Sequence, residues 1–329
     1  MTKRCGYLAL LGRPNAGKST LLNALVGDKI AGVSRKPQTT RNRILGVAHH
    51  RETQILVLDT PGLHHAKGRD YLNVAMNKVA LATAGDADLL LYLVDGTIGF
   101  TDQDAVFLAK ALRTSKAPLA IAVSKVDILP KYEMRPRKVQ IAEALEAFFE
   151  VPENAEYEAR LTGRTLFAWS AKRPEDIAEV KEFVAAHLPE GPWLYEEDDL
   201  TDRPRQFLVG ELIREQLFRQ LGDEIPYGAA VQVQRIEMKA EITVVEARIL
   251  VAREAHKPIV LGKGGARIKE IGSEARASLE KHFESKVFLQ LQVGVANAWT
   301  SDAKLVAELA QMTELGDIGS GGHNAAGPQ

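Results

Sequence analysis

The chain has 329 residues, of which 45% are hydrophobic and 26% charged, and its formal net charge is -1. This length accommodates about two domains of ordinary size, and a charge so close to zero gives no global sign of a nucleic-acid partner. The single cysteine, Cys5, excludes an intrachain disulfide and fits a reducing compartment. The longest apolar run, near residues 89–94, is too short to span a bilayer, so we expect a soluble, cytoplasmic protein.

Apolar, strand-like segments alternate with amphipathic, helix-like segments through the first half of the chain. Strands are predicted at residues 7–11, 55–58, 89–94, 119–123 and 166–169, and a further strand at 44–50 follows a polar loop and is expected at a sheet edge. Helices are predicted at residues 18–26, 70–83, 103–113, 138–149 and 175–187. This alternation predicts an α/β domain over residues 1–188, with a mainly parallel sheet covered on both faces.

The pattern changes near residue 189, where two prolines and a glycine end the preceding helix and an acidic run follows, which predicts a linker at 189–204. Beyond it we expect a helix at 207–221, strands at 229–237, 242–251 and 287–293, and helical segments at 257–261, 266–283 and 302–312. Short connections between these strands predict a separate, smaller α+β domain over residues 205–313. The tail, 314–329, is rich in glycine and alanine and is predicted to be disordered.

Residues 12–19 read Gly-Arg-Pro-Asn-Ala-Gly-Lys-Ser, a complete G-x-x-x-x-G-K-S motif between a predicted strand and a predicted helix. That context distinguishes a phosphate-binding loop from a chance glycine turn, because backbone N–H groups and a helix N-terminus both favour an anion. Lys18 is predicted to reach the β- and γ-phosphates, and Ser19 to offer its hydroxyl to Mg²⁺. The residues predicted to bind the nucleotide here are Gly12, Asn15, Ala16, Gly17, Lys18, Ser19 and Thr20.

Three further segments, each at the end of a predicted strand, identify the nucleotide as guanine. In residues 59–62 (Asp-Thr-Pro-Gly), Asp59 can hold Mg²⁺ through water and the N–H of Gly62 can meet a γ-phosphate. In residues 124–127 (Ser-Lys-Val-Asp), Asp127 can accept from the N1 and amino groups of guanine, a donor pair that adenine lacks. Lys125 can lay its stem over the base. Each segment is weak alone, but their order after a phosphate loop is not a coincidence.

Residues 170–172 (Ser-Ala-Lys) end the last predicted strand of the first domain. The backbone N–H of Ala171 is placed to meet the guanine oxygen. This segment completes the predicted base site, whose members are Ser124, Lys125, Asp127, Ser170, Ala171 and Lys172.

With these motifs the chain resembles the translation-factor-related GTPases. Residues 34–41 (Ser-Arg-Lys-Pro-Gln-Thr-Thr-Arg) also look like the first switch loop of the Era family of bacterial GTPases. In that family a switch threonine meets Mg²⁺ and γ-phosphate only in the GTP state; Thr40 is our choice, with Thr39 the alternative. The resemblance thus implies metal ligands Ser19, Thr40 and Asp59. It implies catalytic roles for Lys18, Asn15, Thr40 and Gly62.

Three residues bear on catalysis and on affinity. Leu63 stands where Ras-like enzymes have a water-positioning glutamine, so slow intrinsic hydrolysis is expected. Asn15 is equally consistent with a side chain that stabilises its own loop and with the asparagine that helps hold K⁺ in related GTPases. Ser124 replaces the asparagine of the family's N-K-x-D motif and can make only one of its two bonds, so weaker guanine affinity is expected.

Residues 262–265 (Gly-Lys-Gly-Gly) form a G-x-x-G turn between two amphipathic segments of the second domain. This resembles the KH domain, whose turn approaches the phosphates of about four single-stranded nucleotides. Residues 251–292 contain eight Lys or Arg and five Glu, a local net charge of 8 - 5 = +3. A lone turn can also simply join two helices, but the order of elements matches the KH variant of Era proteins. The predicted RNA contacts are Gly262, Lys263, Gly264, Gly265 and Arg267.

The resemblance to the Era family covers roughly residues 5–312. It implies a GTPase that binds GTP and GDP with Mg²⁺, binds small-subunit ribosomal RNA, and acts in small ribosomal subunit assembly; use of K⁺ is a hypothesis that depends on Asn15. It also implies peripheral association with the inner face of the membrane, and a monomer is the default. A non-hydrolysing, GTP-dependent RNA-binding scaffold is the alternative that Leu63 and Ser124 favour. A metabolic kinase would need an acceptor pocket and a catalytic acid, and the sequence indicates neither.

Overall fold

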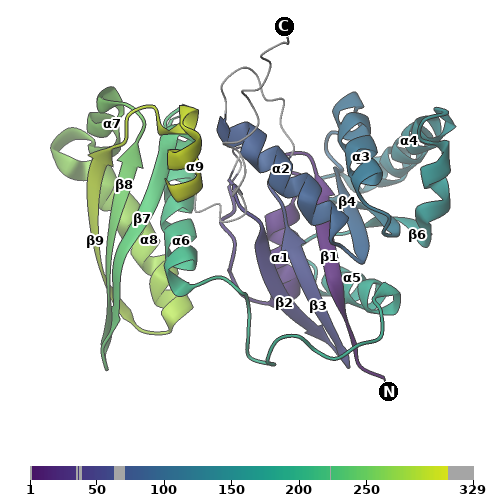
Figure 1. Ribbon diagram of the computed structural model, residues 1–329, viewed down its shortest axis with the longest axis horizontal. Helices are drawn as coiled ribbons and strands as arrows, with labels where there is room; N and C mark the ends of the chain where they lie inside the picture. The colour runs from purple at the N-terminus through teal and green to yellow at the C-terminus, as the bar shows by residue number, and fades with distance from the viewer. Residues whose placement is uncertain (1, 35, 37–38, 63–70, 223, 310–329) are drawn as a thin grey trace, which may run out of the picture. The chain divides into compact units, whose positions relative to one another are not determined.

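The computed structural model describes residues 2–34, 36, 39–62, 71–222 and 224–309. The described residues group into two compact units, which divide along the chain between Leu208 and Val209, except that residues 71–75 group with the second unit (Figure 1). The predicted tail at 314–329 and the Leu63 position lie outside the described residues. No helix in the described part of the chain is long and apolar enough to cross a membrane.

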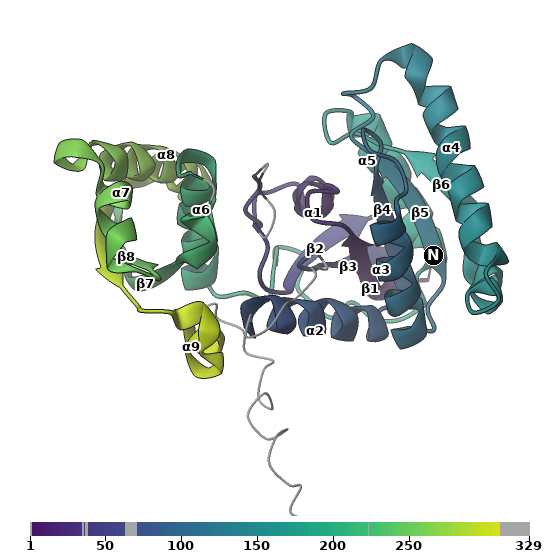
Figure 2. The ribbon, with the colours of Figure 1, turned by 90° about the horizontal axis from the view of Figure 1, so that it is seen from above.

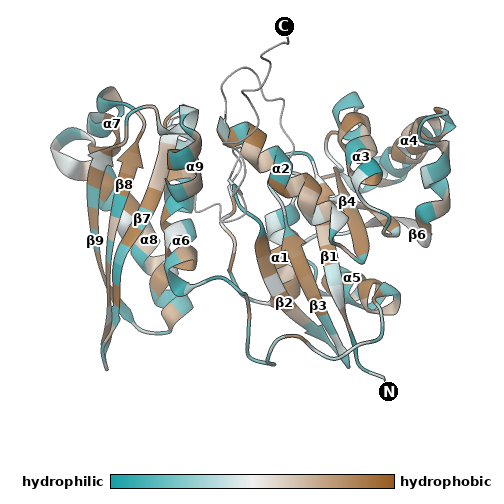
Figure 3. Cartoon of the chain, viewed as in Figure 1, coloured by the Kyte–Doolittle hydropathy of each residue, from teal (hydrophilic) through white to brown (hydrophobic). Residues whose placement is uncertain are grey.

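The first unit is built on a six-stranded sheet with the order β2-β3-β1-β4-β5-β6. All neighbouring strands are parallel except β2, which is antiparallel to β3 and lies at the edge. The mainly parallel sheet and its edge strand are therefore as predicted. Central strands are buried on both faces and appear as brown, apolar ribbons in Figure 3. The strands are β1 (Arg4–Gly12), β2 (Ile44–His50), β3 (Thr53–Asp59), β4 (Leu89–Asp95), β5 (Leu119–Ser124) and β6 (Leu161–Ala168).

Helices cover both faces of this sheet (Figures 1 and 2). On one face α1 (Lys18–Val26) and α5 (Pro174–His187) pack side chains such as Leu21 and Val180 against the strands. On the other, α3 (Asp102–Thr114) and α4 (Lys131–Glu150) share a core with the end of α2 (Tyr71–Gly85). Parallel strands so covered end together at one edge, where the loops that follow them meet.

Helix α4 begins at Lys131 and not at residue 138 as predicted, and it contains Pro136. The prediction placed the helix start after this proline, which removes one helical N–H and usually ends a helix. The apolar periodicity also begins only at Ile141, whereas Tyr132 is 77% exposed. The first turns of α4 are therefore largely polar, with Met134 packed partly against the core, and their apolar pattern is too weak to predict the helix start.

The second unit contains a three-stranded sheet with the order β7-β8-β9. Strands β7 and β8 are antiparallel, whereas β8 and β9 are parallel and are joined through two helices, as a parallel crossover requires. The last helix ends at Leu309 in the described residues, and predicted positions 310–312 lie beyond them. The elements are α6 (Arg205–Gln220), β7 (Ala229–Met238), β8 (Ile242–Val251), α7 (Lys257–Leu261), α8 (Ala266–Phe283), β9 (Lys286–Val295) and α9 (Ala303–Leu309).

The segment predicted as a linker, residues 189–204, is hydrogen-bonded along the edge of the first sheet. The backbone N–H of Val47 donates to the carbonyl of Leu200 over 2.9 Å. The hydroxyl of Thr201 donates to the carbonyl of Leu45 over 2.6 Å. The side-chain oxygen of Gln54 accepts from two backbone N–H groups of the same segment. We call this segment the edge strap, since it covers part of an edge strand that would otherwise be unpaired.

Candidate functional site

The phosphate loop connects β1 to α1 and has left-handed backbone at three positions. Gly12 has φ +138°, and a side-chain carbon there would lie 2.5 Å from the carbonyl oxygen of Leu93. Gly17 has φ +99° and caps α1, and Asn15 has φ +63°. Glycine and asparagine are the residues that adopt such backbone at low cost. The resulting curl is of the kind that turns successive N–H groups towards an anion.

Lys18 lies buried across this loop, with 6% of the residue exposed. Its ammonium donates to the carbonyl oxygens of Gly12 and Arg13, each over 2.9 Å. Burial lowers the pKa of Lys18 to about 8, although the carboxylates of Asp59 and Asp104 act to raise it. The ammonium therefore lies inside the loop, where a phosphate would replace the two carbonyls as its partner.

Three oxygen-bearing side chains from three separate segments meet beside the loop. The hydroxyl of Ser19 donates to Asp59 Oδ2 over 2.6 Å and lies 2.7 Å from the hydroxyl of Thr40. The hydroxyl of Thr40 donates to the same carboxylate oxygen over 3.3 Å. Asp59 is fully buried, and burial raises its pKa to about 6.

This cluster fits Mg²⁺ because hard cations prefer oxygen ligands. The second carboxylate oxygen of Asp59, Oδ1, is buried and has no hydrogen-bond partner, which leaves it available to a cation or its water. Among the described residues no group of three His, Cys, Asp or Glu side chains could hold a metal. The site therefore depends on hydroxyls and one carboxylate.

The structure separates the two switch threonines. The hydroxyl of Thr39 lies 2.6 Å from that of Ser34 and donates to the carbonyl of Lys36 over 2.8 Å. Thr39 thus stabilises its own loop, whereas Thr40 is directed at Asp59.

The Asp-Thr-Pro-Gly segment lies directly on the phosphate loop. A side-chain carbon at Gly62 would lie 2.6 Å from the backbone nitrogen of Pro14, so only glycine fits there. The hydroxyl of Thr60 donates to the carbonyl of Leu10 over 2.8 Å and ties the segment to β1. Loss of the γ-phosphate would therefore affect both the phosphate loop and the Asp-Thr-Pro-Gly segment, because the two are in contact.

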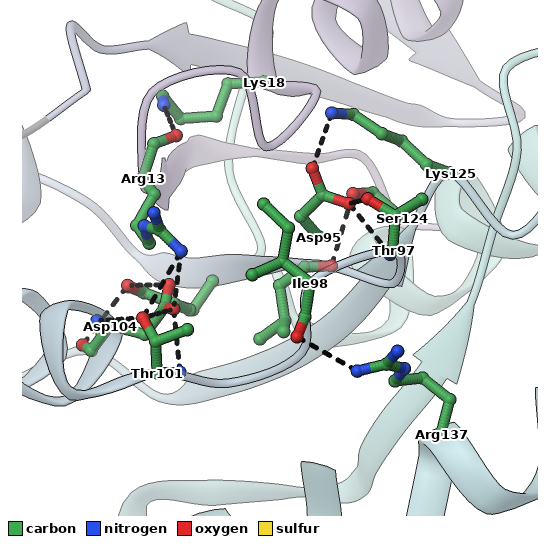
Figure 4. A network of polar contacts seen from close by, with 12 residues as sticks. Arg13, Lys18, Asp95, Thr97, Ile98, Thr101, Asp104, Ser124, Lys125 and Arg137 are labelled. Carbon is green, nitrogen blue, oxygen red and sulfur yellow. Dashed lines mark hydrogen bonds and ion pairs between the residues drawn. The ribbon is translucent and has the colours of Figure 1, made fainter. Parts of the chain in front are cut away.

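The predicted base-recognition residues gather where β5 and β6 end. Asp127 accepts from the hydroxyl of Ser170 over 2.8 Å and pairs with the ammonium of Lys172 at 2.7 Å. The Lys172 hydrogen bond is the main cause that lowers the pKa of Asp127, so the carboxylate stays ionised as an acceptor. Lys125 has φ +58°, and its ammonium bonds to Asp95 over 2.6 Å (Figure 4).

Two other members of the predicted base site differ in exposure. Ser124 is fully buried, and its hydroxyl donates to the carbonyl of Val94 in β4 over 3.2 Å. Its single donor is therefore directed at the neighbouring strand. Ala171 is exposed beyond the end of β6.

A polar network that the sequence did not reveal holds the phosphate loop against α3. Figure 4 shows Arg13 directed at Thr101 and Asp104; its Nη1 donates to the hydroxyl of Thr101 over 3.3 Å and lies 3.7 Å from Asp104 Oδ2. Asp104 is 2% exposed, accepts from the hydroxyl of Tyr92 over 3.0 Å, and forms a capping box with Thr101. Burial, and then Asp104, raise the pKa of Tyr92, which keeps its hydroxyl a donor. The Thr-x-x-Asp spacing is a capping signal, but no sequence rule links it to Arg13.

In the second unit the G-x-x-G turn lies between α7 and α8. Gly262 has φ +71°, and a side-chain carbon there would lie 2.6 Å from the Cβ of Arg267. Gly264 has φ +60° and nothing within 4 Å of its side-chain position, so its backbone is open to a ligand. Gly265 also has positive φ, and Lys263 is exposed.

Two further residues of this unit have partners within the protein. The guanidinium of Arg267 donates to the carbonyl of Gln220 over 2.5 Å. Trp299 is fully buried and donates to the carbonyl of Gly228 over 2.9 Å, so it is a packing anchor and not a surface on which a base could stack.

Comparisons with known proteins agree with this architecture. Residues 7–125 match the family model described as 50S ribosome-binding GTPase, and residues 224–300 match the KH domain model. Fold and site together define a P-loop GTPase followed by a KH domain. The chain is 39% identical to GTPase Era of Pseudomonas putida over 306 residues, which cover 93% of this chain and 96% of that protein. It belongs to the Era family of GTPases.

Solved structures of Era proteins match both units. A crystal structure of an Era variant from Aquifex aeolicus bound to GDP and aluminium fluoride has a TM-score of 0.82 and 33% identity, covering 94% of this chain and 99% of that one. Era in complex with MgGDPNP and nucleotides 1506–1542 of 16S ribosomal RNA has a TM-score of 0.83 at the same identity and coverage. The predicted family, fold class and GTPase activity are confirmed, and the non-hydrolysing alternative is set aside.

We expect Asp104→Ala to destabilise the first unit by about 2–4 kcal/mol. The change removes a capping box and leaves Tyr92 and Arg13 without their buried acceptor. Asp102→Ala is the matched control, because Asp102 lies in the same first turn of α3 but is exposed and should change stability by less than about 0.5 kcal/mol. Urea unfolding measures both, and equal losses would contradict the assigned network.

We expect Thr40→Ala to weaken binding of a GTP analogue about 10-fold in the presence of Mg²⁺, and to leave GDP binding nearly unchanged. In the GTP state the Thr40 hydroxyl is expected to contact Mg²⁺, and the alanine variant loses this contact with a charged group. Thr39→Ala, which removes the neighbouring hydroxyl, should retain the preference of the wild type. Titration with fluorescent nucleotides checks this, and a larger effect at Thr39 would reverse the assignment.

Proposed function

We propose that this GTPase is a molecular switch that binds small-subunit ribosomal RNA and acts in small ribosomal subunit assembly. The observation that carries the proposal is the open, left-handed backbone of the G-x-x-G turn at Gly264, joined in one chain to the nucleotide site. The similarity to an Era structure that holds a 16S ribosomal RNA fragment and a GTP analogue supports it, since the similarity extends over both units.

In this proposal Lys18 and the N–H groups of the phosphate loop bind the β- and γ-phosphates. Ser19, Thr40 and Asp59 hold Mg²⁺, which neutralises charge that develops on the phosphates during transfer. The ionised Asp127 selects guanine through its N1 and amino donors.

The edge strap supplies a physical route from the switch to the second unit. Arg43 lies three residues after Thr40 and directly before β2, and its carbonyl accepts a hydrogen bond from the guanidinium of Arg203 in the edge strap. The strap then continues directly into α6. Loss of the γ-phosphate would release Thr40 and allow the backbone that follows it to move. The hydrogen-bonded strap would then be displaced, which would couple GTP binding to RNA binding.

We also propose that a potassium ion takes part in GTP hydrolysis. Asn15 has left-handed backbone in the phosphate loop, and Leu63 cannot orient water, so hydrolysis needs another charge near the phosphates. A potassium ion held with the help of Asn15 would supply it.

We expect GTP hydrolysis to be at least about 10-fold faster in K⁺ than in Na⁺ at equal ionic strength, because an added cation near the transferring phosphate stabilises its charge. In Asn15→Ala the two rates should become equal while GDP affinity changes little. Phosphate release assays measure the rates. If the wild type hydrolyses GTP equally fast in both salts, Asn15 only stabilises the loop.

We expect Gly264→Asp to weaken RNA binding at least about 10-fold, since it places a carboxylate where phosphates would approach. Nucleotide affinity should not change. The probe is a single-stranded RNA with the 3′-terminal sequence of 16S ribosomal RNA, in a fluorescence anisotropy titration.

Gly191→Asp is the matched control for this variant, because it adds the same charge at an open position outside the second unit. It should retain RNA binding. If Gly264→Asp loses nucleotide binding as well, the assignment of separate sites to the two units is wrong.

A further inference from the structure

Two side chains lie beside Gly17 in the phosphate loop, with room for about one methyl group between them and the glycine. A side-chain carbon at Gly17 would lie 3.6 Å from Cβ of Ser124, and 3.6 and 3.7 Å from Cζ2 and Cη2 of the Trp169 indole. Ser124 ends β5, and Trp169 follows β6, with its backbone N–H bonded to the carbonyl of Val123 over 2.9 Å. The ends of the two adjacent strands β5 and β6 thus place both side chains next to the phosphate loop.

The Trp169 ring is buried between the sheet and two helices. It is 2% exposed and belongs to the same apolar core as Leu21 of α1 and Ile177 of α5. Its Nε1–H is buried and has no hydrogen-bond partner. An unpaired donor costs stability, and phenylalanine would avoid that cost. The ring is therefore held in this position for its size and shape and not for a hydrogen bond.

Ser124 is matched to this ring. The residue is fully buried, and its hydroxyl is directed away to Val94. An asparagine at this position would add two heavy atoms beside the buried indole, in an interior that accepts such additions poorly. A small residue at 124 and a large one at 169 therefore belong together.

We propose that Trp169 is a positioning residue for the nucleotide: its indole supports Gly17, and thereby the phosphate loop, in place of the side-chain bond that an asparagine at position 124 would supply. The inference rests on the proposed guanine site, because it explains how that site works with serine at position 124. Trp169 acts through Gly17 and contacts no reacting atom.

The test is a double-mutant cycle on the full-length chain, with dissociation of fluorescent GDP as the measurement. Trp169→Leu and Ser124→Asn should each weaken GDP binding about 10-fold or more. The double variant should recover to within about 3-fold of the wild type, because the asparagine then has room to bond. Trp169→Phe should retain most affinity, since it keeps a ring. Additive losses in the double variant would overturn the proposal.

A control separates positioning from general stability. Leu25→Ala removes a large side chain from the same core, at the far end of α1 from Gly17, and should lower stability without changing GDP affinity. If Leu25→Ala weakens GDP binding as much as Trp169→Leu does, Trp169 has only a structural role. The ¹⁹F resonance of fluorinated Trp169 should also shift on GDP addition, whereas that of buried Trp299 should not.

Nucleotide competition measured on the wild-type protein shows whether a failure concerns the role of Trp169 or the guanine site itself. Competition of GDP and ATP against the fluorescent nucleotide comes first. Clear preference for GDP together with additive variants overturns only the role of Trp169. Equal competition by ATP overturns the guanine site itself, and the inference with it.

Discussion

The close approach of backbone to backbone at the ends of β1 and β3 is the constraint on which the nucleotide site depends. Gly12 lies so near β4, and Gly62 so near Pro14, that any side chain at either position would overlap backbone atoms. Parallel strands end together at one edge of the sheet, so these approaches follow from the fold. They bring together the phosphate loop, the oxygen-bearing side chains of Ser19, Thr40 and Asp59, and the Asp-Thr-Pro-Gly segment, and the polar chemistry of the site depends on that contact.

Electrostatics sharpen this arrangement. Burial disfavours the charged forms of both Lys18 and Asp59: it lowers the pKa of the first to about 8 and raises that of the second to about 6. Neither charged group therefore regains, from the protein alone, the full stabilisation that water gives it. A phosphate with its magnesium ion brings an anion to the lysine and a cation to the aspartate. Binding thus offsets two desolvation penalties at once, which favours the nucleotide with its metal over either alone.

The sequence predicted the parts of the fold and site that depend on local pattern. The phosphate loop, the strand ends at Asp59 and Ser124, and the G-x-x-G turn were all placed because short motifs and periodicity define them. The Arg13–Asp104 contact and the bonds of the edge strap were missed, because each joins residues distant in sequence, for which a single chain gives no signal. The start of α4 was missed for a different reason, since its first turns are largely polar and contain Pro136.

The edge strap changes how communication along the chain should be understood. A free linker of this composition would transmit little, since a flexible chain absorbs a displacement at either end. Here the strap is bonded to β2 at Leu45 and Val47 and to Arg43, which lies between the switch loop and β2. A movement at Arg43 must therefore either carry the strap with it or break its hydrogen bond to Arg203. Because these bonds hold the segment up to the residues that directly precede α6, the description of residues 189–204 as a free linker does not fit this structure.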